Sequence, residues 1–240
     1  MIISHEHQYL FVELPHTAST AISRELQRHY DGTPILHKHA YYHQFLQSAS
    51  EEEKQCFVFS GIRNPMDEAV SMYFKYRENH RGNYTDPSKL KQSGGHVTAA
   101  DLRRFHFLRR TGADFGSYFL KFYWLPYDNW SSLAHHRFDF TIRFETLQED
   151  FERLLKLLGI HQRRALPAAN PTGGKSAPFR SYFTGETHQR AQWVFGPFMR
   201  KWGYTFPPRW NAIEMRPVND VLFHIVSIYR NARRRHLSPK

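Results

Sequence analysis

The stretch CFVFSGIRNPMDEAVSMYF, residues 56–74, contains the pattern of a buried strand directly followed by the pattern of a helix. Cys56–Ile62 is a nearly continuous apolar run of the kind found inside parallel sheets. A helix start follows at once, because Asn64 can cap, Pro65 suits the first helical position and the first turn is acidic. We therefore expect a buried strand joined by a tight turn to a helix that runs to about Arg77.

Two similar transitions lie on either side of this stretch. Tyr9–Leu14 is a short apolar run that precedes a polar turn and a helix-compatible segment, whose apolar positions are Ala21, Ile22 and Leu26. Phe138–Phe144 reads as a strand, and Thr146–Glu149 has the capping-box pattern that opens an amphipathic helix ending near Gly159. A shorter strand is expected around Pro34–Lys38. Strands that alternate with helices predict an α/β fold, with a parallel sheet of about four or five strands flanked by helices.

The rest of the chain is less regular. Residues 79–97 are polar and rich in glycine, which predicts a loop. Thr98–Asp101 can open a helix that Gly112 closes, and further helices are expected at about Glu186–Trp202 and Pro217–Arg235.

Composition predicts one folded domain. The chain has 240 residues, of which 40% are hydrophobic and 16% aromatic, and this excludes disorder as its main state. Cys56 is the only cysteine, so an internal disulfide and a multi-cysteine metal centre are excluded. No apolar run approaches the roughly 18 residues of a membrane span, and the first residues lack a signal-peptide pattern, so we expect a cytoplasmic protein. A single domain over 1–240, with a helical C-terminal extension at about 209–240, is the expected organisation.

The formal net charge of +11 indicates an anionic partner. Nucleotide phosphates, acidic glycans, membrane headgroups and nucleic acid all satisfy that charge. The basic residues occur as scattered pairs, which are typical of solvated faces, so nucleic acid is not favoured.

The turns after the first and the third predicted strands carry candidate binding residues, because ligands of open α/β sheets bind at the carboxyl ends of strands. In the first turn, backbone N–H groups lie with the hydroxyls of Thr17, Ser19 and Thr20 at a helix N-terminus, a pattern that can hold phosphate. In the second, Arg63 ends a strand and Ser71 follows eight residues later, where the pair can bind another anion. Taken separately, the first pattern also fits a simple helix cap and the second a salt bridge.

Together, Leu14–Thr20 and Arg63–Tyr73 resemble the two nucleotide-binding signatures of the sulfotransferases that use 3′-phosphoadenosine 5′-phosphosulfate (PAPS). In that family a Pro-Lys-Thr-Gly-Ser/Thr-Thr-like loop holds the 5′-phosphosulfate, and an Arg-Asn-Pro stretch with a later serine holds the 3′-phosphate. The resemblance extends from about Tyr9 to Pro207 and includes Ile142–Leu147 and Phe195–Pro197.

The resemblance implies a P-loop-like nucleotide-binding fold and sulfuryl transfer from PAPS to a hydroxyl or amine without a catalytic metal. It implies that nucleotide is bound by His16, Thr17, Ala18, Ser19, Thr20, Arg63, Ser71, Lys175 and Arg180. The acceptor is not identified: a carbohydrate and a small molecule both fit, and the basic chain favours an acidic one.

Two positions depart from the family pattern. His16 stands where the family has lysine, and Ala18 where it usually has glycine. An imidazole can take the place of the lysine when it is protonated, a state that nearby phosphate and sulfate charges favour. The resemblance therefore gives His16 a catalytic role.

A histidine near the end of the second predicted strand is the base in family members, and His39 lies 24 residues before Arg63, in that interval. On a strand, His37 and His39 would face opposite sides, so only one could reach the cleft, and His43 is the next candidate. The same three histidines could instead bind a metal, although no cysteine assists them.

Residues 169–176 nearly match a phosphate-binding Walker A loop but lack its first glycine and a preceding strand. The resemblance suggests instead a loop over the nucleotide, with Lys175 and Arg180 contacting its phosphates or the acceptor; an ordinary surface loop is the alternative.

Two other functions stay open. A P-loop phosphotransferase would need a Gly-Lys-Ser/Thr loop where this chain has Pro15–Thr17, and a degenerate protein would bind nucleotide or polyanions without catalysis.

Overall fold

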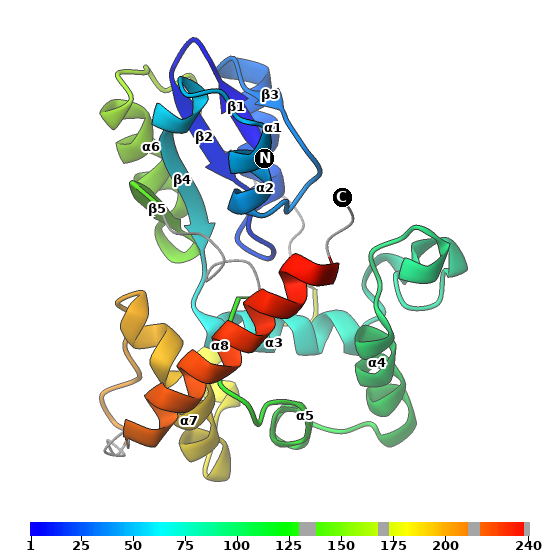
Figure 1. Cartoon of the computed structure of the whole chain (residues 1–240). Helices are drawn as coiled ribbons and strands as arrows, with labels where there is room; N and C mark the ends of the chain where they lie inside the picture. The colour runs from blue at the N-terminus through cyan, green and yellow to red at the C-terminus, as the bar shows by residue number, and fades with distance from the viewer. Residues whose placement is uncertain (130–137, 168–172, 211–216, 238–240) are drawn as a thin grey trace. The chain divides into compact units, whose positions relative to one another are not determined.

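A computed structural model describes residues 1–129, 138–167, 173–210 and 217–237 (Figure 1). The chain divides into two compact units. The first comprises Met1–Asn64, Asp128–Asn170 and Ser227–Lys240, and the second Pro65–Tyr127 and Pro171–Val226.

The first unit contains a five-stranded sheet in the order β3-β1-β2-β4-β5. Its strands are β1 (Ile2–Ser4), β2 (Tyr9–Val12), β3 (Thr33–Pro34), β4 (Phe57–Ile62) and β5 (Phe140–Arg143). The pairs β2–β4 and β4–β5 are parallel, as predicted, and the number of strands falls in the expected range.

The expectation of a wholly parallel sheet is wrong, because β1 pairs antiparallel with both β2 and β3. Ile3 of β1 lies opposite Leu10 of β2, so only a short turn joins the two strands. A link this short can connect antiparallel strands only, since a parallel pair needs a long crossover. The N-terminal hairpin therefore makes the sheet mixed.

Two helices, α1 (Ser19–His29) and α6 (Leu147–Leu157), bury apolar side chains against the sheet. The core that they share with the strands includes Phe11, Phe59, Ile142, Ile22, Leu26, Phe151 and Leu154. The predicted capping box of α6 is not formed, because the Thr146 hydroxyl donates to the Asp150 carboxylate at 3.0 Å instead of capping the helix. A short helix, α2 (Tyr42–Ser48), was not expected from the sequence.

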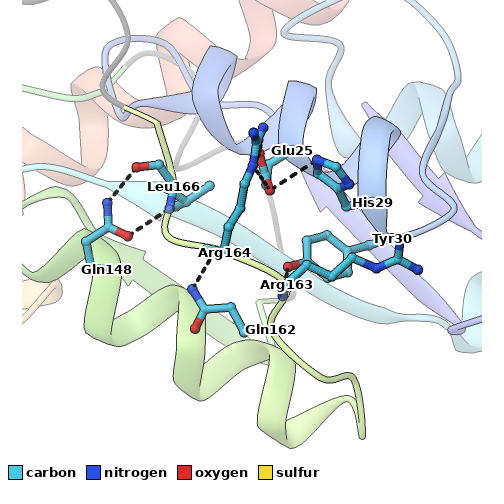
Figure 2. Close-up of polar contacts among 8 residues, drawn as sticks. All are labelled: Glu25, His29, Tyr30, Gln148, Gln162, Arg163, Arg164 and Leu166. Atoms are coloured by element: carbon cyan, nitrogen blue, oxygen red, sulfur yellow. Dashed lines mark hydrogen bonds and ion pairs between the residues drawn. The ribbon is translucent and has the colours of Figure 1, made fainter.

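Polar contacts fix the segment after α6 to both helices (Figure 2). The Arg164 guanidinium donates three hydrogen bonds of 2.8–3.2 Å to the buried Glu25 carboxylate of α1. The backbone N–H of Arg163 donates to the Tyr30 hydroxyl at 3.0 Å, and the Gln148 side chain of α6 exchanges two 2.9 Å hydrogen bonds with the backbone of Leu166. These contacts align a segment without regular structure across α1 and α6.

The second unit is helical, with α3 (Pro65–Arg77), α4 (Ala99–Thr111), α5 (Phe115–Phe122) and α7 (Glu186–Lys201). A further helix, α8 (Pro217–Leu237), contributes residues to both units. The predicted helix that Thr98–Asp101 opens and Gly112 closes is confirmed. The Asp101 N–H donates to the Thr98 hydroxyl, the Thr98 N–H donates to the Asp101 carboxylate, and Gly112 ends the helix at a φ of 62°.

The core of the second unit is aromatic and includes Phe105, Phe115, Tyr118, Phe119 and Phe195. Core packing thus accounts for these rings. Across the portion of the chain that the structure describes, every helix is too short or too polar to cross a bilayer.

Candidate functional site

The turn between β2 and α1 has a backbone shape suited to an anion. His16 and Ala18 both have left-handed φ angles, 63° and 62°, with Thr17 between them. Ala18 is the N-cap of α1, where no side chain caps the helix and no acidic residue occupies the first turn. A turn of this kind directs backbone N–H groups at the positive end of a helix toward one point, which is how proteins hold phosphate. We call residues 14–20 the phosphate loop.

The phosphate loop is held in place by β4. Thr17 is 1% exposed, and its hydroxyl donates to the Leu14 carbonyl at 2.9 Å. A Cβ at Gly61 would lie 2.8 Å from the Thr17 carbonyl oxygen and 2.9 Å from the Thr17 hydroxyl. Only glycine therefore allows the strand to approach the loop so closely, and sequence reasoning did not single it out.

Arg63 follows β4 and lies beside the same loop. It is buried, its guanidinium donates to the His16 carbonyl at 3.4 Å, and the guanidinium carbon lies 4.1 Å from the centre of the Phe144 ring. The next residue, Asn64, donates its backbone N–H to the Glu145 carboxylate at 2.7 Å. The guanidinium of Arg63, between β4 and α3, is thus held in place beside the phosphate loop.

His39 lies near the loop but not on a strand. Because β3 ends at Pro34, the expectation that His37 and His39 alternate along a strand is wrong; His39 occupies a turn with a φ of 65°, and His37 is exposed. His39 Nδ1 lies 2.6 Å from the Glu13 carbonyl oxygen. A carbonyl can only accept, so Nδ1 carries the proton and Nε2 is the basic nitrogen of the neutral ring.

Burial lowers the pKa of His39 from 6.5, and the nearby charges of Lys38 and His16 lower it further, against the opposing effect of the Glu13 hydrogen bond. At neutral pH the ring is therefore uncharged and able to accept a proton. The Glu13 carbonyl that sets its tautomer could not be identified from the sequence, because a backbone acceptor leaves no residue pattern.

The first unit thus brings together the sequence-predicted residues His16, Thr17, Ala18, Ser19, Thr20, His39 and Arg63. His43, the next candidate base, lies on α2, where its ring stacks on Tyr41.

The remaining predicted residues belong to the second unit. Ser71 is buried on α3, and Lys175 pairs with the Asp67 carboxylate of the same helix. Arg180 is exposed in a short 3-10 helix, with its guanidinium over the Phe179 ring. Residues 168–172 of the Walker-like segment lie outside the described residues. No group of three or more potential metal ligands occurs in the described parts of the chain.

These features define an α/β protein in which a loop with a backbone suited to an anion follows the carboxyl end of a parallel strand, next to a buried arginine and a histidine of lowered pKa. A family model described as "Sulfotransferase family" matches residues 1–193. The chain therefore belongs to the sulfotransferase family, as the resemblance of its two signatures indicated. Comparisons with curated proteins and with solved structures gave no significant match.

Proposed function

We propose that this protein transfers the sulfuryl group of PAPS to a hydroxyl or amine of an acceptor. The observation that carries the proposal is the contact of Arg63 with the phosphate loop, because it unites the two predicted phosphate-binding elements in one place. Family membership supports the reaction type, and the basic chain supports an anionic nucleotide substrate.

In the proposed reaction the chain positions substrates and stabilises charge. The backbone amides and hydroxyls of residues 17–20 hold the 5′-phosphate, while Arg63 and Ser71 bind the 3′-phosphate. His16 balances the charge that grows on the leaving phosphate oxygen. Lys175 and Arg180 assist at the phosphates or the acceptor.

His39 is the proposed base. The acceptor oxygen or nitrogen attacks sulfur, the bond from sulfur to the bridging phosphate oxygen breaks, and adenosine 3′,5′-bisphosphate leaves. The acceptor proton passes to Nε2 of His39, which is the nitrogen left basic by the Glu13 contact. Each step needs positioning and electrostatics rather than a redox centre.

The test is thermal unfolding with adenosine 3′,5′-bisphosphate, ATP and AMP in parallel, since a ligand that binds only the folded state raises Tm. We expect stabilisation by the bisphosphate and not by AMP. Stabilisation by ATP alone would indicate a phosphotransferase, and no shift with any nucleotide would refute the proposal.

Arg63→Ala should abolish binding of the bisphosphate, whereas Arg28→Ala, which removes an exposed arginine at the end of α1, should leave it unchanged. Because Arg63 is buried and stacked on Phe144, Arg63→Lys is the second variant: it keeps the charge but loses the planar fork, so binding should still weaken. Affinity unchanged in both Arg63 variants would overturn the assignment. Sulfuryl transfer itself is then followed with PAPS over a panel of neutral and acidic acceptors.

A further inference from the structure

A second cation reaches the phosphate loop from outside it. Lys38 follows β3 in the turn that contains His39, and its ammonium group donates to the Thr20 hydroxyl at 2.7 Å. Thr20 stands at the start of α1, in the loop that we assign to the 5′-phosphate. Lys38 is exposed on the surface, yet its charged end is directed at this hydroxyl 18 residues away in the sequence.

The backbone around Lys38 is shaped to direct it there. Leu36 and His39 both have left-handed φ angles, 55° and 65°, which are costly for residues other than glycine. Such strain persists where the surrounding structure enforces it, and it is frequent at binding sites. Here the contact of His39 with the Glu13 carbonyl fixes one end of the turn and the contact of Lys38 with Thr20 fixes the middle.

The sequence of the phosphate loop leaves a role for Lys38, because the loop has no lysine of its own. The family pattern has a lysine within this loop, and this chain has His16 in its place. Residues 14–20 contain neither lysine nor arginine, so a lysine or arginine at the loop has to come from another segment. Among the described residues, Lys38 is the lysine whose ammonium group contacts the phosphate loop.

We propose that Lys38 replaces the missing loop lysine and binds the 5′-phosphosulfate of the nucleotide from the neighbouring turn. This inference rests on the proposed function and deepens it. The ammonium exchanges its hydrogen bond to Thr20 for one to a phosphate or sulfate oxygen, and no covalent bond changes at the lysine. Lys38 also adds positive charge close to His39, which lowers the pKa of the proposed base in the same direction as burial does.

The experiment measures the affinity of Lys38→Met for adenosine 3′,5′-bisphosphate and for adenosine 3′-monophosphate, which lacks the 5′-phosphate. Removing one hydrogen bond to a charged group lowers affinity by about 10–100-fold. We expect this loss for the bisphosphate and not for the monophosphate. The matched control is Arg24→Met, because Arg24 is an exposed cation one helical turn beyond Thr20 on α1, whereas the Thr20 hydroxyl accepts its hydrogen bond from Lys38. This control should change the affinity by less than about threefold, as for a screened surface charge.

Adding His16→Lys to Lys38→Met should restore most of the bisphosphate affinity, because it returns the charge to the position where the family has it. An affinity of Lys38→Met within about twofold of the wild type would overturn the role of Lys38 while leaving the proposed function intact. An equal loss for both nucleotides, or the same loss in Arg24→Met, would also overturn it. If the wild-type protein binds neither nucleotide, the proposed function fails and the inference falls with it.

Discussion

Gly61→Ala tests whether β4 sets the shape of the phosphate loop. The added methyl group would lie 2.8 Å from the Thr17 carbonyl oxygen, 0.6 Å short of the 3.4 Å at which ordinary contact begins. The atoms that it meets are the carbonyl and the short side chain of Thr17, and the Thr17 hydroxyl is already tied to Leu14. No flexible side chain can move aside, so the loop itself has to shift.

Overpacking of this kind costs about 1–3 kcal/mol of unfolding free energy, which in a chain of this size lowers Tm by about 2–4 °C for each kcal/mol. The same shift of the loop should also lower the affinity for nucleotide. Each hydrogen bond to a charged group contributes about 1.5–3 kcal/mol, so one misplaced loop amide weakens binding of adenosine 3′,5′-bisphosphate by at least about 10-fold.

Calorimetric titration with the bisphosphate and thermal unfolding of the nucleotide-free protein measure the two effects. The control is Gly116→Ala on α5, where the new methyl group would lie 3.7 Å from Thr187, at ordinary contact distance. That variant should bind nucleotide normally and unfold at the same or a higher temperature, because alanine suits a helix better than glycine. The reasoning is refuted if Gly61→Ala retains both the wild-type affinity and the wild-type Tm.

Two further predictions concern His39 and Arg164. The transfer rate should rise with pH as His39 loses its proton, with a midpoint below 6.5, because burial lowers the pKa of His39 from that value. His39→Asn should remove the rise, and a midpoint above 6.5 would contradict the assignment. Arg164→Leu should lower Tm more than Arg163→Leu. The first variant leaves the buried Glu25 carboxylate without three hydrogen bonds, whereas the second keeps the backbone contact with Tyr30. Equal melting temperatures of the two variants would contradict this ranking.

Local features of the fold could be predicted where a few neighbouring residues determine them. The helix after β4 begins at Pro65 and ends at Arg77, as its first turn and its length indicated, because proline fixes the first φ angle. The start of the helix at Thr98–Asp101 and its end at Gly112 were likewise predicted from the residues at its two ends. In contrast, the pattern Thr146–Glu149 did not form its box, since Thr146 donates instead to Asp150, a competing acceptor that the pattern does not include.

Features that depend on distant pairing escaped sequence reasoning. The strands β1 and β3 are three and two residues long, too short for alternation to show, and their antiparallel partners become visible only in the sheet. The short length of β3 also explains why the sequence wrongly placed His39 on a strand. The apolar and polar residues around Pro34–Lys38 resemble a strand, but pairing with β1 ends at Pro34, and the histidine instead takes its orientation from the Glu13 carbonyl.

The neighbours of the phosphate loop hold it in a backbone conformation that its own residues do not favour. Left-handed φ angles at His16 and Ala18 cost about 1–2 kcal/mol each, so these residues would not adopt the conformation by preference. Contacts from outside the pair oppose that cost: Thr17 is tied to Leu14 and packed on Gly61, and Arg63 holds the His16 carbonyl. Because the neighbours rather than a loop glycine fix the backbone, alanine is tolerated at position 18. In the same way, Lys38 from the adjoining turn contacts a loop that contains no lysine of its own.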